Sequence, residues 1–486
     1  MNNTTVIRNA DWVVGWDEAR GAHAYYRDID VAFTDTEIVH VGASYDGAAD
    51  TEIDGRDRLI IPGLVNLHAH PADEALRKGI TDETHSPGFH HSSLYEFLGT
   101  FRNDAEGGRA SVKVAIAELL MSGCTTFTDL SAPYDGWLDI VADSGIRGVI
   151  APGFRSARWY TPDGHSLQYE WNEDAGVKAF DNATKVIERA ENHPSGRLSG
   201  MVYPAQIDTC TPEILRDSFD YAEQENLPWQ IHAAQSVTEF QELQQRHGKT
   251  AVQFLDSLGV LGDRSIIGHA IFLDHHPWLH WSSRTDLDTL AEKGVNVAHC
   301  PTVFARRGIT LRTLGSYIRK GVNVCLGTDT YPHNFLEEMR AAMMYARVIG
   351  ETVADLDTSD VFNVATIGGA RALHRDDIGR LASGCKADLV SIDLKHPSMR
   401  PMREPIRSLL YVACERAVRD VYVDGRLVVE DGKVLTIDYE AASEALEEAQ
   451  KRSLSHTPEL DWDGRTAEQL SPMVFPIAGS NYPPNE

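Results

Sequence analysis

Cysteine is scarce in this chain. Six of its 486 residues are cysteine, and no two of them form a Cys-x-x-Cys pair. Cysteines scattered in this way exclude a disulfide-rich scaffold and a zinc site built from thiolates. The first residues also lack a basic segment followed by an apolar one, so the sequence predicts no secretion signal. Both absences favour a reducing compartment, and we expect a cytoplasmic protein.

Basic residues are few relative to acidic ones. The sequence has 45 Lys and Arg against 72 Asp and Glu, which gives a net charge of −27. Such a surface repels nucleic acids and anionic lipids. No uninterrupted apolar run approaches the roughly 18 residues that a membrane helix needs. We therefore expect no nucleic-acid or membrane partner. The expected partners are a small-molecule substrate and further copies of this chain in a homo-oligomer.

Strand and helix patterns divide the chain into parts. Residues 1–60 and 377–439 consist of short strands and turns, which predicts one small β-sandwich domain built from both chain ends. Residues 61–376 alternate short apolar strands with amphipathic helices, which predicts an α/β fold with a TIM-like (β/α)8 barrel. Residues 440–486 begin with a charged helix over 440–453 and continue as a tail that we expect to be irregular.

Two histidines stand at the end of the first strand of the barrel region. In the stretch Leu64-Val65-Asn66-Leu67-His68-Ala69-His70, His68 and His70 share one strand face, about 7 Å apart along the backbone. Two imidazoles on one face can share a divalent metal when further ligands arrive from elsewhere. Because such pairs also occur by chance, the remaining strands decide whether a metal site exists.

Further candidate ligands follow at the ends of later strands: His232, His269, His299 and Asp329. Imidazoles with one carboxylate suit Zn²⁺, Fe²⁺, Co²⁺ or Mn²⁺ and disfavour cations that prefer all-oxygen sites. A single strand-end histidine is often a hydrogen-bonded core residue, and Asp329 fits a helix N-cap equally well. The joint pattern nevertheless predicts a metal site at the carboxyl ends of the strands.

Motifs spread over residues 6–434 resemble one known family. They are Pro62-Gly63-Leu64-Val65-Asn66-Leu67-His68-Ala69-His70, Ser122-Gly123-Cys124-Thr125-Thr126, Gly268-His269-Ala270, His299-Cys300-Pro301-Thr302, Gly327-Thr328-Asp329 and Gly384-Cys385-Lys386-Ala387-Asp388-Leu389-Val390. The chain resembles the metal-dependent amidohydrolase superfamily, in the branch that holds cytosine deaminase, the guanine and adenosine-type aminohydrolases and the triazine hydrolases. Within that superfamily, the phenylurea and molinate hydrolases are the nearest functional analogues.

The resemblance implies a ligand set and two catalytic residues. It implies one divalent ion per chain, with zinc expected and Fe, Co or Mn as alternatives, bound by His68, His70, His232 and Asp329. Asp329 takes a proton from the attacking water and delivers it to the leaving group, and His269 hydrogen-bonds the developing oxyanion. The sequence leaves open whether His299 or Asn66 touches the metal.

Two departures from the branch narrow the expected chemistry. Deaminases of this branch carry Glu three residues after the His of the fifth strand, where this chain has Gln235, and a substrate-binding His where it has Ala205. A neutral amide cannot donate a titrating proton to a ring nitrogen. We therefore expect hydrolysis of an amide, urea, carbamate or thiocarbamate bond of a small, largely apolar molecule such as a phenylurea. The expected substrate-binding residues are Gln235, Tyr331, Phe304 and Trp159.

Two alternatives stay open. The first is an aminohydrolase, deaminase or dehalogenase of an N-heterocycle, in which Glu239 or Glu74 replaces the missing acid. The second, from another functional class, is a non-catalytic protein that binds a metal or ligand.

Overall fold

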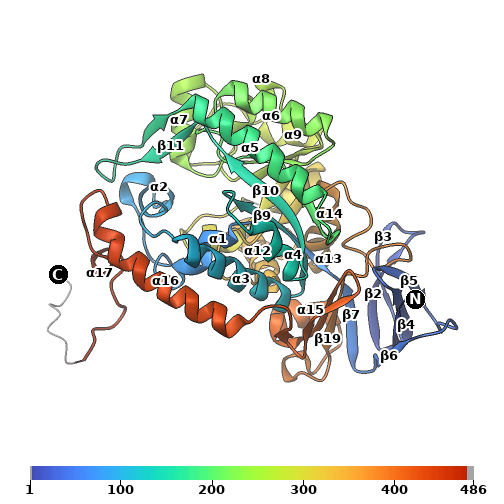
Figure 1. Cartoon of the computed structure of the whole chain (residues 1–486). Helices are drawn as coiled ribbons and strands as arrows, with labels where there is room; N and C mark the ends of the chain where they lie inside the picture. Colours follow the sequence, from blue (N-terminus) through green and yellow to red (C-terminus); the bar gives the residue numbers. More distant parts are fainter. Residues whose placement is uncertain (1–2, 313, 479–486) are drawn as a thin grey trace.

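Parallel strands form two sheets in the molecule (Figure 1). The computed structural model describes residues 3–312 and 314–478. One sheet has the order β13-β10-β9-β8, with β14 paired to β10, and the other has the order β15-β16-β17-β18. Their bounds are β8 Leu64–Ala69, β9 Cys124–Ser131, β10 Arg147–Phe154, β13 Leu198–Gly200, β14 Tyr203–Pro204, β15 Trp229–Ala233, β16 Ser265–His269, β17 Asn296–His299 and β18 Asn323–Leu326.

Isolated bridges join the two sheets at both edges. Ala69 at the end of β8 pairs with Asp329 beyond β18, and Gln206 beyond β14 pairs with His232 on β15. All these pairings are parallel. The carboxyl ends of the strands therefore gather at one end of the molecule, where α/β proteins bind their ligands. The α/β class that the sequence predicted is confirmed.

Amphipathic helices alternate with these strands and lie outside them (Figure 1). In α6 (Pro212–Gln224), Thr211 caps the helix by accepting a hydrogen bond from the Ile214 amide at 3.3 Å, and Pro212 fits the first turn. Its buried residues recur every three or four positions: Ile214, Leu215, Ser218, Phe219 and Ala222. None of the described helices combines the length and apolar content that a membrane span requires.

The other helices between and after the strands differ widely in length. They are α1 Pro71–Glu74, α2 Leu94–Phe97, α3 Ala105–Met121, α4 Trp137–Asp143, α5 Glu173–Glu191, α7 Val237–His247, α8 Ala251–Leu258, α9 Asp286–Glu292, α10 Pro301–Ala305, α11 Leu314–Lys320, α12 Phe335–Gly350, α13 Thr358–Asn363, α14 Gly369–Ala372 and α15 Pro405–Ser408. A short hairpin of β11 (Ala157–Tyr160) and β12 (Gln168–Trp171) projects after β10.

Strands from both chain ends share one sheet. Its order is β22-β21-β20-β19-β7-β2-β3, and β19 pairs antiparallel with β7, so that Leu389 lies opposite Pro62. A second sheet, β5-β4-β1-β6, contains only N-terminal strands. The bounds are β1 Thr4–Ala10, β2 Trp12–Asp17, β3 Ala22–Tyr26, β4 Ile29–Thr34, β5 Glu37–Gly42, β6 Thr51–Asp54, β7 Arg58–Pro62, β19 Leu389–Asp393, β20 Val418–Val423, β21 Arg426–Glu430 and β22 Lys433–Val434. The predicted domain boundaries stay a prediction.

The C-terminal part contains more helix than the sequence predicted. α16 spans Tyr439–Leu460 where we expected a helix over 440–453, and the predicted irregular tail includes α17 (Ala467–Leu470). Pro458, which disfavours helix, lies inside the last turn. Leu454 packs against the apolar cluster around Phe97 and Phe101. Tertiary packing therefore extends the helix beyond the point where local preference would end it.

A buried ion pair ties β10 to the sheet of the chain ends. Arg147 at the start of β10 donates two hydrogen bonds to Asp388, both at 3.0 Å, and a third to Asp424, also at 3.0 Å. The Arg147 and Asp388 side chains are only 4% and 1% exposed. Removing one partner from such a pair leaves an uncompensated buried charge.

We expect Asp388→Ala to lower the free energy of unfolding by about 3–5 kcal/mol, because the buried Arg147 charge then loses two of its three hydrogen bonds to carboxylates and keeps only the one to Asp424. Urea denaturation measures this change. The control is Lys293→Ala, which removes an exposed ion pair with Asp256 and is expected to cost less than about 1 kcal/mol. Similar losses in the two variants would contradict the prediction.

Candidate metal centre

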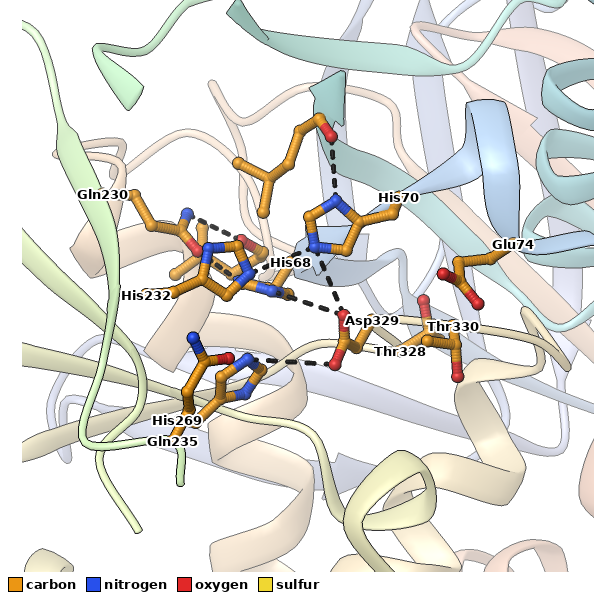
Figure 2. A network of polar contacts seen from close by, with 12 residues as sticks. His68, His70, Glu74, Gln230, His232, Gln235, His269, Thr328, Asp329 and Thr330 are labelled. Atoms are coloured by element: carbon orange, nitrogen blue, oxygen red, sulfur yellow. Dashed lines mark hydrogen bonds and ion pairs between the residues drawn. The ribbon is translucent and has the colours of Figure 1, made fainter. Parts of the chain in front are cut away.

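Five predicted site residues converge at the carboxyl ends of the strands (Figure 2). His68 lies on β8, His232 on β15 and His269 at the end of β16. His70 and Asp329 lie just beyond their strands, where the His70 amide donates a hydrogen bond to the Asp329 carbonyl at 2.9 Å. Residues two apart on a strand point to the same side, which brings His68 and His70 together.

Four of these side chains place their ligand atoms close together. The ligand atoms of His68, His70, His232 and Asp329 all lie within 4.8 Å of one another. His68 Nε2 and His70 Nε2 lie 3.6 Å and 3.3 Å from Asp329 Oδ1. His70 Nε2 and His232 Nε2 are 3.2 Å apart. The structure thus brings together the four ligands that the resemblance implied.

Hydrogen bonds at Nδ1 orient all three imidazoles. His68 Nδ1 lies 2.5 Å from the Gln230 side-chain oxygen. His70 Nδ1 lies 2.9 Å from the Leu130 carbonyl, and His232 Nδ1 lies 2.7 Å from the Ala205 carbonyl. Because each of these oxygens is an acceptor, each Nδ1 carries the proton and each Nε2 keeps a free lone pair.

This arrangement fits a divalent cation. His68 Nε2 is buried and has no hydrogen-bond partner among the described residues. The unprotonated Nε2 atoms of His70 and His232 face each other at 3.2 Å, which is repulsive without a positive charge nearby. Three imidazole nitrogens and one carboxylate oxygen form a ligand set that suits zinc. The geometry therefore makes these four residues the candidate ligands of one divalent metal ion.

Burial and neighbouring charges favour the protonation states that bind a metal. Burial lowers the pKa of His70, and burial together with the adjacent imidazoles lowers the pKa of His232 well below its usual value. Burial alone would raise the pKa of Asp329, but contacts with His68 and His269 hold it well below its usual value. Neutral imidazoles and an ionised carboxylate are the forms that coordinate metal ions.

His269 lies beside the four ligands. Its Nε2 is 3.8 Å from Asp329 Oδ2, and its ring meets Phe304 edge-on with centroids 4.6 Å apart. Its ligand atom also belongs to a second close set, which consists of His68, His269, Cys300 and Asp329. Burial raises the pKa of the Cys300 thiol well above its usual value. His269 lines the cavity beside the candidate ligands, where it can contact a substrate.

Two amide side chains that support the ligands were not among the predicted site residues. Asn66 Oδ1 accepts hydrogen bonds from the His68 amide at 3.1 Å and the Thr328 amide at 3.2 Å. Gln230 orients His68 as described above, and its Nε2 donates to the Leu67 carbonyl at 3.0 Å. A sequence signal existed, because Asn66 and Gln230 each stand two residues before a ligand and so share its strand face.

The structure locates the two residues whose contact with the metal the sequence left open. Asn66 Oδ1 accepts hydrogen bonds from the His68 and Thr328 amides, so this side chain holds the backbone next to two candidate ligands. His299 is buried and belongs to neither set of close ligand atoms among the described residues.

A cavity of about 400 Å³ opens onto the metal ligands. Three of the four residues expected to bind the substrate line this cavity, namely Gln235, Phe304 and Trp159, whereas Tyr331 lines a smaller neighbouring cavity and hydrogen-bonds Thr81. The lining is more charged than we predicted, since it includes five arginines: Arg77, Arg102, Arg155, Arg158 and Arg307. The sequence did not reveal this, because the arginines come from three segments that lie far apart in the chain. A largely apolar substrate is therefore not supported.

One of the two candidate acids lies in this cavity. The Glu74 carboxyl lines the cavity and forms an ion pair with Arg77, and Figure 2 shows it near Thr330 and Asp329. Burial raises the pKa of Glu74, against the opposing charge of Arg77. Glu239 is also buried, but it bonds the Ala234 amide at 2.6 Å and is not among the described lining residues.

Relatives of known function cover most of this chain. It is 30% identical to a 5'-deoxyadenosine deaminase of Methanothermobacter thermautotrophicus over 407 residues, which covers 83% of this chain and 89% of the relative. It is also 30% identical to a 5-methylthioadenosine/S-adenosylhomocysteine deaminase of Nitratidesulfovibrio vulgaris over 445 residues, 88% of this chain and 92% of the relative. These names disfavour our prediction of phenylurea or carbamate hydrolysis and favour the deaminase alternative.

Solved structures share the fold. An adenosine deaminase from Xanthomonas campestris with bound zinc has a TM-score of 0.79 at 22% identity, covering 93% of this chain and 98% of that one. A zinc complex of atrazine chlorohydrolase from Arthrobacter aurescens has a TM-score of 0.76 at 21% identity, covering 92% and 100%. At these identities the likeness shows the fold alone.

Removing any metal ligand should empty the site. We expect His68→Ala, His70→Ala and Asp329→Ala each to lose the metal ion and turnover, while the parent chain holds about one ion. Elemental analysis of purified protein gives the metal content. Full metal content and activity in any of the three variants would contradict the assignment.

His269→Asn should separate substrate contact from metal binding. We expect this variant to retain its metal but to lose about 10²–10³ in kcat, as is typical for removal of one oxyanion donor. Elemental analysis and kcat are measured on the same sample, with His70→Ala as the metal-free comparison. A metal-free His269→Asn protein would instead make His269 a ligand.

Residues 59–428 match the family model described as the amidohydrolase family. That range contains all four metal ligands, His269 and the strands that carry them. The chain is therefore a metal-dependent hydrolase of carbon–nitrogen bonds other than peptide bonds, and it belongs to the amidohydrolase family.

Proposed function

We propose that this enzyme is an aminohydrolase that removes the amino group from a six-membered N-heterocycle, with adenosine-type nucleosides as the substrate class. Water adds to the ring carbon, the bond to the exocyclic nitrogen breaks, ammonia leaves and a ring carbonyl forms. The names of the two relatives support this substrate class. The cavity of about 400 Å³ lies within the usual range for small-molecule sites, about 300–1,000 Å³.

The observation that carries the proposal is the position of Glu74. Deamination of a heterocycle needs an acid to protonate the ring nitrogen, and Gln235 cannot supply that proton. The Glu74 carboxyl lines the same cavity as Gln235 and as the metal ligands His70, His232 and Asp329. The carboxylic acid of this site therefore lies on α1, after β8, whereas the branch carries its acid after the fifth strand, at the position of Gln235.

Asp329 and His269 handle the remaining proton and charge. When bound, a divalent ion lowers the pKa of a water molecule and polarises the substrate. Asp329, whose carboxyl lies 3.3 Å from His70 Nε2 and 3.8 Å from His269 Nε2, accepts the proton of the attacking water and passes it to the leaving amine. His269 stabilises the negative charge that develops on the attacking oxygen.

A second candidate is hydrolysis of an amide, urea or carbamate. Gln235 favours this second candidate, because a neutral amide stands where the branch has an acid. Its Nε2 donates a hydrogen bond to the Gln206 side chain at 2.5 Å. An acyl carbon is already electrophilic and needs no protonated ring nitrogen. The charged lining of the cavity does not favour the apolar phenylureas that we first expected.

Two further expectations belong to the same proposal. We take the ring of strands that the isolated bridges complete to be a (β/α)8 barrel, with the sheets of the chain ends as its companion domain. We also keep the prediction of a homo-oligomer, which light scattering of the purified enzyme can check.

A mixed substrate panel separates the two candidate functions. We expect ammonia release from 5'-deoxyadenosine or a related nucleoside to exceed amine release from any aryl urea or carbamate by at least about 10²-fold in kcat/KM, which is the lower end of the discrimination that enzymes reach through pocket contacts. Ammonia and amine are quantified in parallel with the same metal-loaded enzyme. A faster urea or carbamate would select the second candidate.

Glu74→Gln tests the acid. We expect kcat for the nucleoside to fall by about 10²–10⁴, the usual contribution of a general acid, with the metal content unchanged. Asp73→Asn is the matched control, since Asp73 lines the same cavity but is exposed, and it should keep kcat within about threefold. Equal losses in both variants would remove Glu74 from this role.

A further inference from the structure

The C-terminal segment of residues 439–471 packs against the loop that follows β8. The segment lies outside residues 59–428, which match the family model. It consists of α16, α17 and the turn between them, and Figure 1 shows α16 lying along α3. We call residues 439–471 the C-terminal segment and residues 70–104, between β8 and α3, the β8–α3 loop.

The β8–α3 loop forms one wall of the cavity. Beyond the metal ligand His70, it contributes Glu74 and Arg77 near the site and Tyr95, Leu98 and Arg102 further along the wall. Most of the loop has no strand or long helix to hold it, since its helices α1 and α2 have four residues each. The position of the wall therefore depends on what packs against its outer side.

A buried carboxylate fastens the loop to the segment. Glu96, on α2 next to Tyr95, is 9% exposed. Its Oε1 accepts hydrogen bonds from Trp462 Nε1 at 2.9 Å and from an Arg465 guanidinium nitrogen at 2.6 Å. Its Oε2 accepts from the Ser86 hydroxyl at 2.5 Å. Charge-assisted hydrogen bonds of this kind are about twice as strong as neutral ones.

Arg465 is itself fixed within the segment. It donates to both carboxylate oxygens of Asp461, at 2.9 Å and 2.7 Å, and the Asp461 side chain is fully buried. The guanidinium of Arg465 also lies over the Trp462 ring, 4.9 Å from its centroid. The two donors that hold Glu96 are therefore preorganised by the segment before they meet the loop.

Further hydrogen bonds hold both ends of the loop. Gln450 Nε2 donates to the Leu76 carbonyl at 2.6 Å, and the Ser471 hydroxyl donates to the Ile80 carbonyl at 2.7 Å. At the far end, Arg452 pairs with Asp104 at 2.6 Å, and Asp104 is the N-cap of α3.

Apolar packing completes the contact. Ile80, Phe97 and Phe101 of the loop are buried in one cluster with Ala467 of α17, and Leu454 and Leu470 pack against that cluster. Phe97 lies two residues after Tyr95, so this packing fixes α2 from the side opposite the cavity. Burial of such side chains is the main source of stability for a short irregular segment.

We propose that the C-terminal segment positions the β8–α3 wall of the substrate cavity, and that Trp462 and Arg465 set substrate affinity through Glu96 without touching the substrate. The inference rests on the proposed use of this cavity, but it does not depend on which carbon–nitrogen bond is cleaved. The residues concerned are positioning residues, and the metal ligands keep their places without them.

Arg465→Gln and Trp462→Phe test the proposal. We expect amide hydrogen exchange in residues 79–103 to speed up by about tenfold or more, because this segment opens locally, while exchange in β8, β15 and β16 is unchanged. With the preferred substrate of the panel, KM should rise by roughly tenfold, because ordering a loosened wall costs binding free energy. The kcat value should stay within about threefold, and the metal content should stay full. Arg465→Lys should restore part of the protection.

The matched control is Lys451→Gln, which removes an exposed ion pair with Glu448 on the same helix and should change neither exchange nor KM. The exchange measurement needs no substrate, so failure of the proposed function leaves it valid. Unchanged exchange in residues 79–103, or loss of protection spread evenly over the whole protein, would overturn the proposal. A fall in kcat with KM unchanged would contradict the proposal that Trp462 and Arg465 set substrate affinity.

Discussion

The fixed orientation of three imidazoles is the interaction on which the site depends. Each Nδ1 meets an acceptor on another strand or just beyond it, namely the Gln230 side chain and the carbonyls of Leu130 and Ala205. Each Nε2 is thereby directed at one point beside Asp329. Two of these acceptors are backbone carbonyls, so the orientation of the imidazoles depends on the register of the strands. A shift of one strand by one residue would remove the acceptor that orients a ligand.

The cavity above the metal is built by different rules from the metal site. Its floor comes from strand ends, but its walls come from loops, and these loops bring several arginines into a protein whose net charge is −27. The overall charge therefore does not describe the cavity, because local side chains dominate the field in a confined space. The same loops supply Glu74, so the chemistry that the site supports depends on the loops as much as on the metal.

The buried ion pair of Arg147 and the metal ligands lie at opposite ends of the strands. Arg147 stands at the start of β10 and binds Asp388 and Asp424 from the C-terminal strands, whereas the metal ligands stand at the opposite, carboxyl ends. The N- and C-terminal parts of the chain meet beside the amino ends through the pairing of β7 with β19. The C-terminal segment then runs back to the cavity, where it supports the β8–α3 loop. One chain end thus serves both roles.

The sequence by itself determined the α/β class, because that class depends on local periodicity. Strand-end positions also brought out the candidate ligands, His299 included, and the family resemblance then singled out four of them and His269. A period of two on β8 predicts that His68 and His70 share a face, and alternating strands and helices predict parallel strands whose ends meet. Only the tertiary structure decided which loop residues enter the cavity. Glu74 and several arginines line the cavity. Glu239 instead accepts a hydrogen bond from the Ala234 amide, and Tyr331 lines a neighbouring cavity. Loop convergence depends on contacts between residues far apart in the chain, such as Glu96 with Arg465, and no local pattern records such contacts.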